Sequence, residues 1–163
     1  MTAIQKSNEF QNDFFSKLNL ENKKLTDKMF FDCEFQNCNF SYTDFGSTLF
    51  EDCSFVNCNF SLSQINNTQI RGVIFNNCKI IGIDFTKCDT LTIDFSIEEC
   101  IVKSCIFSNL RLKRSSFHNS DLIECDFVNT DLSEANLSGF TNVFIYEEDN
   151  EIINYKLDDK CTS

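Results

Sequence analysis

Large apolar residues recur at every fifth position along most of this chain. A first run of centres ends near residue 95, with Thr90 as its polar exception, and a second run begins two residues out of step at Ile97. Neither the 3.6-residue period of a helix nor the two-residue period of a strand gives a spacing of five. The centres are Phe30, Phe35, Phe40, Phe45, Phe50, Phe55, Phe60, Ile65, Ile70, Phe75, Ile80, Phe85, Thr90 and Phe95, then Ile97, Val102, Phe107, Leu112, Phe117, Leu122, Phe127, Leu132 and Leu137.

A chain that turns by about 90° every five residues forms a square coil of about twenty residues, and stacked coils lie ~4.8 Å apart, the spacing of a β-ladder. Residues twenty apart then stack, so Phe35 lies under Phe55 and Phe75. The near-repetition of FFDCEFQNCNF at 30–40 by FEDCSFVNCNF at 50–60 follows from this arrangement. The pattern therefore predicts an all-β, quadrilateral β-helix.

Positions two before the centres carry small residues, most often cysteine. Residues two apart in an extended segment point to the same side, so these residues share the interior with the centres, where only small side chains fit beside large rings. Nine of the ten cysteines keep this position through the change of register, and Cys161 does not. The residues predicted to form the structural core are Phe35, Phe40, Phe55, Phe60, Phe75, Phe107, Phe127, Cys33, Cys38, Cys53, Cys58, Cys78, Cys105 and Cys125.

Ten cysteines also raise the alternatives of a metal site and of disulfides. Their CX4C spacing differs from the CX2C of zinc ribbons and places successive cysteines on different sides of the square. Stacked pairs such as Cys33 and Cys53 have Cα atoms within disulfide range, but parallel Cβ vectors hold the Cβ atoms farther apart than the preferred ~3.8 Å. We interpret the cysteines as buried, reduced and structural. The single histidine, His118, follows the centre Phe117 and is expected to face solvent, so we expect no catalytic residue, metal or cofactor.

The units SSFHN, SDLIE, CDFVN, TDLSE and ANLSG at 115–139 resemble the pentapeptide-repeat family, whose pattern is roughly A(D/N)LXX. The resemblance covers about 18–140 and implies a right-handed quadrilateral β-helix. About 27 centres, at four per coil, predict six to seven coils. We therefore divide the chain into a lead-in at 1–17, the β-helix at 18–140 and a C-terminal cap or tail at 141–163.

Three stretches depart from the pattern. The change of register falls within CDTLTIDFSIEECIV at 88–102, where we expect a bulge or short loop. Asp13, Lys23 and Lys28 occupy positions that should be small and buried, so we expect an open or irregular first coil. After Gly139, NVFIYEEDNEIINYKL predicts a hairpin or paired strands that cover the last coil. Many family members dimerise through a comparable segment, which leaves monomer and homodimer open here.

Composition restricts the partners. The net charge of -11 and the pI near 4.4 oppose direct binding to nucleic acid or to an anionic membrane, because like charges repel. The opening MTAIQKSNEF has no apolar run and no window approaches a membrane-spanning length, so we expect a cytoplasmic location. The chain has no GxGxxG or P-loop motif, and we predict no nucleotide site.

The acidic residues are the remaining candidates for function. Eleven net charges on a rod of ~33 Å give about one charge per ~3 Å, against one per ~1.7 Å for duplex DNA. A basic group, Arg111, Lys113 and Arg114, argues against DNA mimicry over the second half. The candidate partner-facing acids are Asp32, Glu34, Glu51, Asp52, Asp94, Glu98 and Glu99.

The segments IRGVIFNNC at 70–78 and IIGIDFTKC at 80–88 resemble the quinolone-resistance branch of the pentapeptide-repeat family, which is bacterial. That resemblance implies a non-enzymatic DNA mimic that binds DNA gyrase or topoisomerase IV and protects it from quinolones. The alternative is an acidic cytoplasmic β-helical scaffold for protein–protein interaction, with no topoisomerase role. An enzyme has no site chemistry behind it in this sequence.

Overall fold

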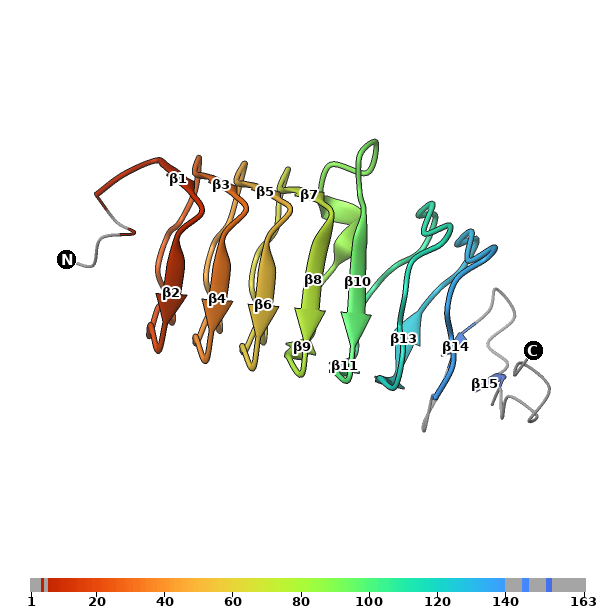
Figure 1. Cartoon of the computed structure of the whole chain (residues 1–163). Helices are drawn as coiled ribbons and strands as arrows, with labels where there is room; N and C mark the ends of the chain where they lie inside the picture. The colour runs from red at the N-terminus through yellow and green to blue at the C-terminus, as the bar shows by residue number, and fades with distance from the viewer. Residues whose placement is uncertain (1–3, 5, 140–144, 147–151, 154–163) are drawn as a thin grey trace.

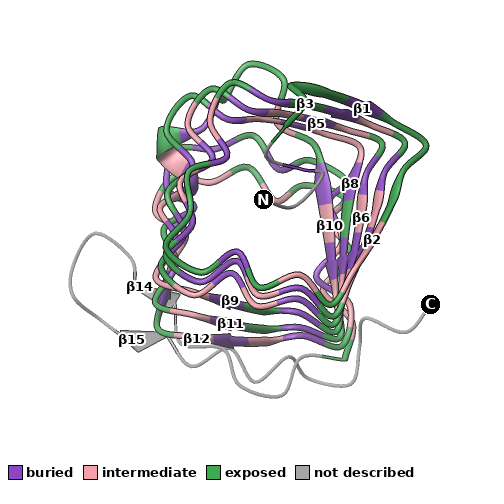
Figure 2. Cartoon of the chain, turned by 90° about the vertical axis from the view of Figure 1, so that its left-hand side faces the viewer, coloured by how far each residue is buried: buried purple, intermediate pink, exposed green. Residues whose placement is uncertain are grey.

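The computed structural model describes residues 4, 6–139, 145–146 and 152–153. Within them the chain winds as a right-handed β-helix of square section, whose coils stack along one axis (Figures 1 and 2). The first side contains β1 (Glu9–Gln11), β3 (Met29–Phe31), β5 (Leu49–Glu51) and β7 (Gln69–Arg71), and the second side contains β2 (Phe14–Ser16), β4 (Glu34–Gln36), β6 (Ser54–Val56), β8 (Val73–Asn76) and β10 (Phe95–Glu98). The third side contains β9 (Lys79–Ile81), β11 (Ile101–Lys103) and β12 (Asp121–Ile123), and the fourth contains the 3-10 helix η2 (Phe85–Lys87) and β13 (Cys125–Asp126), extended by β14 (Ile145–Tyr146) and β15 (Ile152–Ile153).

Residues twenty apart stack, as the spacing predicts. Phe35 pairs with Phe55 and Phe55 with Phe75 in parallel register, with ring centroids 4.7 Å and 5.3 Å apart and ring planes within 13° of parallel. Outward side chains form ladders with the same repeat, since Asn77 Nδ2 donates to Asn57 Oδ1 at 2.6 Å. The interior is therefore a set of stacked aromatic columns.

The corners explain the frequency of Asn and Asp in the sequence. Twenty-one non-glycine residues and three glycines have φ between 51° and 79°, and they follow the centres by two positions. This left-handed conformation is tolerated best by glycine, Asn and Asp. Each five-residue unit thus supplies two inward side chains, two outward side chains and one corner.

The positions two before the centres face inward and bond to the preceding coil. Cys58 Sγ contacts Phe35 O at 3.5 Å, and Thr43 Oγ1 donates to Leu20 O at 2.8 Å. All fourteen predicted core residues are buried. Nine cysteines of the described residues are free and buried, while Cys161 lies outside the described residues.

The change of register is a loop at 89–94, which projects from the first side before β10 (Figure 1). Thr90 is exposed in this loop and is not a centre. Phe95 is not a centre either, because it pairs with Val73, while Ile97 pairs with the centre Phe75. Phe95 stands at the small-residue position and is 2% exposed.

The ladder begins before residue 18. Strands β1 and β2 pair with β3 and β4, so residues 9–16 form the first two sides of a regular coil within the range that the sequence pattern assigns to a lead-in. Asp13 and Lys23 are exposed because no coil lies beneath them, which removes the conflict that the sequence posed. Lys28 is 6% exposed, and its Nζ donates to Ser7 O at 2.6 Å and to Asn8 Oδ1 at 3.4 Å.

Paired strands follow the last full coil, as the sequence predicts. Strand β14 runs parallel to β13, and β15 runs antiparallel to β14. The other residues of the predicted cap, 140–144, 147–151 and 154–163, lie outside the described residues. None of the described helical residues forms a segment with the length and apolar character needed to cross a bilayer.

Candidate functional site

One edge of the rod, where the first side meets the second, carries a line of aspartates. Asp32, Asp52 and Asp94 each directly precede the inward position that opens the second side, and all three are exposed. The corners of Asp32 and Asp52 are successive, because the Asp32 N–H donates to Glu51 O, just before Asp52, at 3.0 Å. We call Asp32, Asp52 and Asp94 the acidic edge.

Two further candidate acids flank this edge. Glu34 lies on the second side beside Asp32, and Glu51 lies on the first side beside Asp52. The corner between Asp52 and Asp94 is Gly72, where an added Cβ would lie 2.4 Å from Asp52 Oδ1. The carboxylate of Asp52 therefore leans along the edge, and only glycine leaves it that room.

The remaining two candidates lie elsewhere. Glu98 is on the second side and Glu99 is at the next corner, where the second side meets the third. The structure therefore brings five of the seven predicted acids together and separates Glu98 and Glu99 from them. The sequence could not align Asp94 with Asp52, because their 42-residue separation becomes two coils only once the loop is placed.

The acids of this edge differ from most others in their bonding. Within residues 6–139, the carboxylates of Asp32, Asp52 and Asp94 have no hydrogen bond or ion pair. In contrast, Asp44 Oδ1 accepts the Gly46 N–H at 2.9 Å, as acids at other turns also do. Free carboxylates are available to a partner without the loss of an existing bond.

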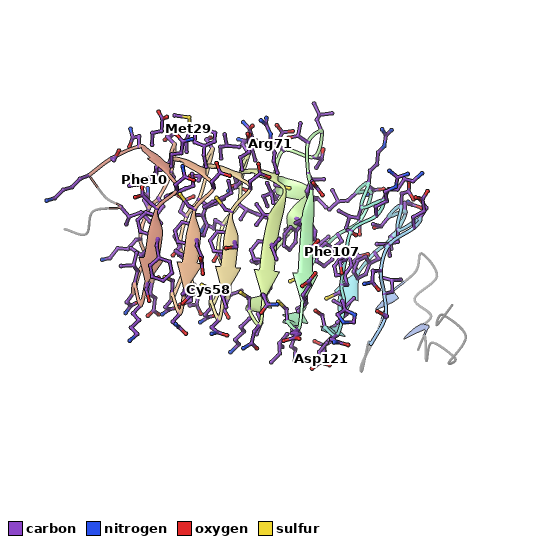
Figure 3. All side chains as sticks on the ribbon, in the orientation of Figure 1. Phe10, Met29, Cys58, Arg71, Phe107 and Asp121 are labelled. Atoms are coloured by element: carbon purple, nitrogen blue, oxygen red, sulfur yellow. The ribbon has the colours of Figure 1, made fainter. Side chains whose placement is uncertain are left out.

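The flanking Glu51 is partly neutralised. Arg71 Nη1 lies 3.2 Å from Glu51 Oε2, and Arg71 Nη2 donates to Gln69 Oε1 at 2.6 Å. Arg71 is labelled in Figure 3. Its Nε also donates to Thr92 Oγ1 at 3.4 Å, which connects the first side to the loop at 89–94. This arginine positions the loop beside the acidic edge.

Negative charge is concentrated in the middle coils. Residues 29–99 hold ten acidic and three basic residues. Residues 6–28 hold four acidic and five basic residues, and residues 100–139 hold five acidic and four basic residues. The segment 140–163 holds six acidic and two basic residues. The middle 71 residues make about 3.5 coils, or ~17 Å of rod at ~4.8 Å per coil, which gives about one net charge per ~2.4 Å. The average over the whole chain therefore understates the charge density of the middle coils.

The basic group of the second half is largely paired. Lys113 Nζ lies 3.0 Å from Glu134 Oε1, and Arg114 Nε lies 2.7 Å from Glu134 Oε2. These two cations hold the pKa of the Glu134 carboxyl below its usual range. The second half of the rod is thus close to neutral, as the basic group in the sequence suggests.

The Cys53 and Cys88 thiols and the histidine lie in environments that do not favour reactivity. Burial raises the pKa of the Cys53 and Cys88 thiols to about 12, which disfavours the reactive thiolate at neutral pH. His118 is half-buried on the outer second side, with Nδ1 2.8 Å from Ser138 Oγ and Nε2 2.9 Å from Asn119 Nδ2. No group of three or more His, Cys, Asp or Glu side chains in the described residues is arranged to hold a metal ion.

Within the described residues, these features define a β-solenoid that presents its outward side chains to a partner. The model described as a pentapeptide repeat region matches residues 28–97, and the model described as pentapeptide repeats (8 copies) matches residues 105–139. Together they span more than half of the chain, and the chain belongs to the pentapeptide-repeat family. None of the curated proteins matches the sequence.

Several solved structures share the architecture at low sequence identity. Full-length QnrB1, described as a plasmid-mediated fluoroquinolone resistance protein, is 14% identical, with 86% of this chain and 94% of that chain covered and a TM-score of 0.37. HetL from Nostoc sp. strain PCC 7120, described as involved in heterocyst differentiation regulation, is 12% identical, with 88% and 91% covered and a TM-score of 0.34. Rfr23 from Cyanothece 51142 is 15% identical, with 91% and 93% covered and a TM-score of 0.32. At these values the likeness carries no argument about function.

Proposed function

We propose that this protein is a non-enzymatic, cytoplasmic binding protein whose acidic edge contacts the basic DNA-binding surface of DNA gyrase or topoisomerase IV. In this proposal it acts as a partial DNA mimic and protects the enzyme from quinolones. The observation that carries the proposal is the line of free carboxylates at Asp32, Asp52 and Asp94, set within the coils that hold the highest charge density.

The physical basis is electrostatic. About one net charge per ~2.4 Å over the middle coils approaches the one per ~1.7 Å of duplex DNA, so a surface built for phosphates would also attract this edge. Successive corners repeat at ~4.8 Å, which places the carboxylate of Asp52 one coil from that of Asp32 and two coils from that of Asp94 along the same edge. Mimicry is confined to the middle coils, because the first coil and the second half are nearly neutral.

Two further points support the proposal. The segment at 70–88 resembles the quinolone-resistance branch of the family in its sequence. Nine unpaired thiols in the core are compatible with the reducing cytoplasm, where gyrase acts.

The test is a supercoiling and cleavage assay with purified gyrase and ciprofloxacin, in which the protein is titrated at ~50 and ~300 mM salt. We expect rescue of supercoiling at low salt and a weaker effect at high salt, because screening weakens attraction between exposed charges. The triple variant Asp32→Asn/Asp52→Asn/Asp94→Asn should require at least tenfold more protein at low salt.

A charge-matched control removes three aspartates from the fourth side, in the variant Asp44→Asn/Asp84→Asn/Asp126→Asn. Each of these carboxylates accepts a backbone N–H two residues on, a bond that the Asn oxygen keeps. This control should behave like the wild type. Equal losses of protection in the two triple variants would mean that the effect depends on net charge and not on the acidic edge. If the wild-type protein has no effect on gyrase or topoisomerase IV, the alternative of an acidic scaffold without a topoisomerase role stands instead.

A further inference from the structure

The third side of the rod holds an unbroken run of four buried thiols. They occupy the inward position that opens this side in four successive coils, and each is at most 3% exposed. Cys58, which is labelled in Figure 3, belongs to this run. We call Cys38, Cys58, Cys78 and Cys100 the thiol column.

Neighbouring members of the column touch one another. The Cys58 N–H donates to Cys78 Sγ at 3.4 Å, and the Cys78 N–H donates to Cys100 Sγ at 3.2 Å. The side chain of Cys58 interacts with those of Cys38 and Cys78, and Cys78 interacts in the same way with Cys100. The four thiols therefore form one continuous array along the rod.

The packing of the rod does not require cysteine at these positions. Thr43 and Thr48 occupy the same inward position on other sides and are fully buried. Ser120 continues the third side after Cys100, and its Oγ accepts the Cys100 N–H at 3.0 Å, as Cys100 Sγ accepts the Cys78 N–H. A hydroxyl thus replaces a thiol without loss of burial or of the backbone contact.

The spacing of the column suits a linear metal site better than a disulfide. Each of the four Sγ atoms lies 3.1–3.4 Å from the carbonyl oxygen two residues earlier, so the four thiols share one orientation. Phe40 and Phe60, the centres that follow Cys38 and Cys58, have ring centroids 5.0 Å apart, which gives the local separation of the coils. A disulfide needs its sulfur atoms ~2.0 Å apart, whereas two metal–thiolate bonds of ~2.3 Å in one line span ~4.6 Å.

We propose that the thiol column binds monovalent thiophilic metal ions, Cu(I) above all, with one ion in each gap between successive thiols. Soft thiolate ligands select Cu(I). A linear site needs only two donors, so it does not require the groups of three or more ligands that the described residues lack. Four thiols leave three gaps: loading releases four protons to solvent, takes up three Cu(I) ions without any change of oxidation state, and leaves one net negative charge on the column.

The length of the run favours binding here over the shorter stacks. One ion between two thiolates also leaves one net negative charge, so the column distributes over three ions a charge that a single pair carries for one ion. Burying an uncompensated charge is costly. We therefore expect the column to load while the stacked pairs on the second and fourth sides stay protonated. These pairs are Cys33 with Cys53 and Cys105 with Cys125.

The test loads the full-length, reduced protein with Cu(I), supplied without oxygen as its acetonitrile complex. Because the column is buried, the ion is added both during refolding from urea and to the folded protein just below its thermal midpoint, and excess glutathione then removes weakly held copper. Native mass spectrometry counts the ions, and X-ray absorption gives the number of sulfur ligands. We expect three ions per chain, each with two sulfur ligands, and a raised thermal midpoint. Zn(II), which takes four ligands, should not be retained.

Serine variants should lose copper in steps. Cys38→Ser leaves two gaps and should retain two ions, while Cys58→Ser leaves one gap and should retain no more than one. Cys58→Ser/Cys78→Ser leaves no successive thiols and should retain none. The control Cys33→Ser/Cys53→Ser removes the same number of thiols from the second side and should keep all three ions. Far-ultraviolet circular dichroism should show that each variant folds, since serine occupies the next position of the same side at Ser120.

Three results would overturn the proposal. The first is a wild-type protein that retains no copper after either loading. The second is equal retention by Cys58→Ser/Cys78→Ser and by the control, which would identify an adventitious ion only. The third is three sulfur ligands per ion in the wild-type protein, which excludes linear sites and decides the question even if a variant fails to fold. None of these measurements involves a topoisomerase, so the inference and the proposed function are tested separately.

Discussion

Replacing one ring of the central column tests the packing on which the whole rod depends. Phe55 is 1% exposed and stacks between Phe35 and Phe75, with edge-on contacts to Phe50 and Phe60 at centroid distances of 5.3 Å and 5.0 Å. Burial and cavity terms for Phe→Ala are about 3–5 kcal/mol, and each aromatic pair adds ~0.5–1.5 kcal/mol beyond area. With its neighbours fixed by the ladder on both sides, we expect Phe55→Ala to cost about 4–5 kcal/mol.

That loss is a large part of the 5–15 kcal/mol that stabilises a typical domain, so it should be plain in urea unfolding followed by far-ultraviolet circular dichroism. With a slope near ~2 kcal/mol/M, the midpoint should fall by about 2 M. Phe14→Ala is the matched control, because Phe14 is 59% exposed and should cost less than about 1 kcal/mol. Equal losses in the two variants, or a loss below ~1.5 kcal/mol for Phe55→Ala, would refute the stacked interior.

Two further predictions concern the interior. Ile70→Phe should extend the stacked column that ends at Phe50 and fill a cavity of about 30 Å³. At ~24 cal/mol per Å³, this raises the free energy of unfolding by roughly 0.7 kcal/mol. Val102→Phe, away from that cavity, should instead cost about 1–3 kcal/mol in the same urea titration. Burial raises the pKa of the Cys53 and Cys88 thiols from 9.0 to about 12, so between these values the folded chain keeps protons that the unfolded chain loses. The free energy of unfolding should therefore be constant below pH 9 and fall between pH 9 and 12 by ~1.4 kcal/mol per pH unit for each thiol. The fall should be less steep in Cys53→Ser, and a level profile up to pH 11 would contradict the prediction.

The architecture could be predicted from the sequence because its period is set by covalent geometry and repeated without interruption over many units. Once a centre is placed, the inward, outward and corner roles of the next four residues follow, which is why Phe55 and Cys53 were assigned correctly. Prediction failed where that count is broken. Phe95 has the size of a centre and the right distance from Phe85, yet the loop at 89–94 moves it to a position that holds small residues in other coils.

The first coil failed for a related reason. A charged residue at an inward position normally argues against a buried site. Asp13 and Lys23, however, belong to the coil at the end of the rod, where no further coil covers the inward positions. Lys28 is buried and still satisfied, because its long side chain reaches Ser7 O at the open end. A sequence pattern counts residues along the chain and contains no information about which coil is the last.

Function is harder to read than fold because the corners serve both. Asp suits the left-handed corner, so an aspartate such as Asp52 satisfies the backbone whether or not a partner needs its charge. Hydrogen bonds do not separate the two cases, since the corner aspartate Asp27 of the first coil is as unbonded as Asp52, whereas Asp44, which directly precedes a centre, is bonded within its own turn. Leu62 differs from both, because an exposed leucine at a left-handed corner suits neither the backbone nor the solvent.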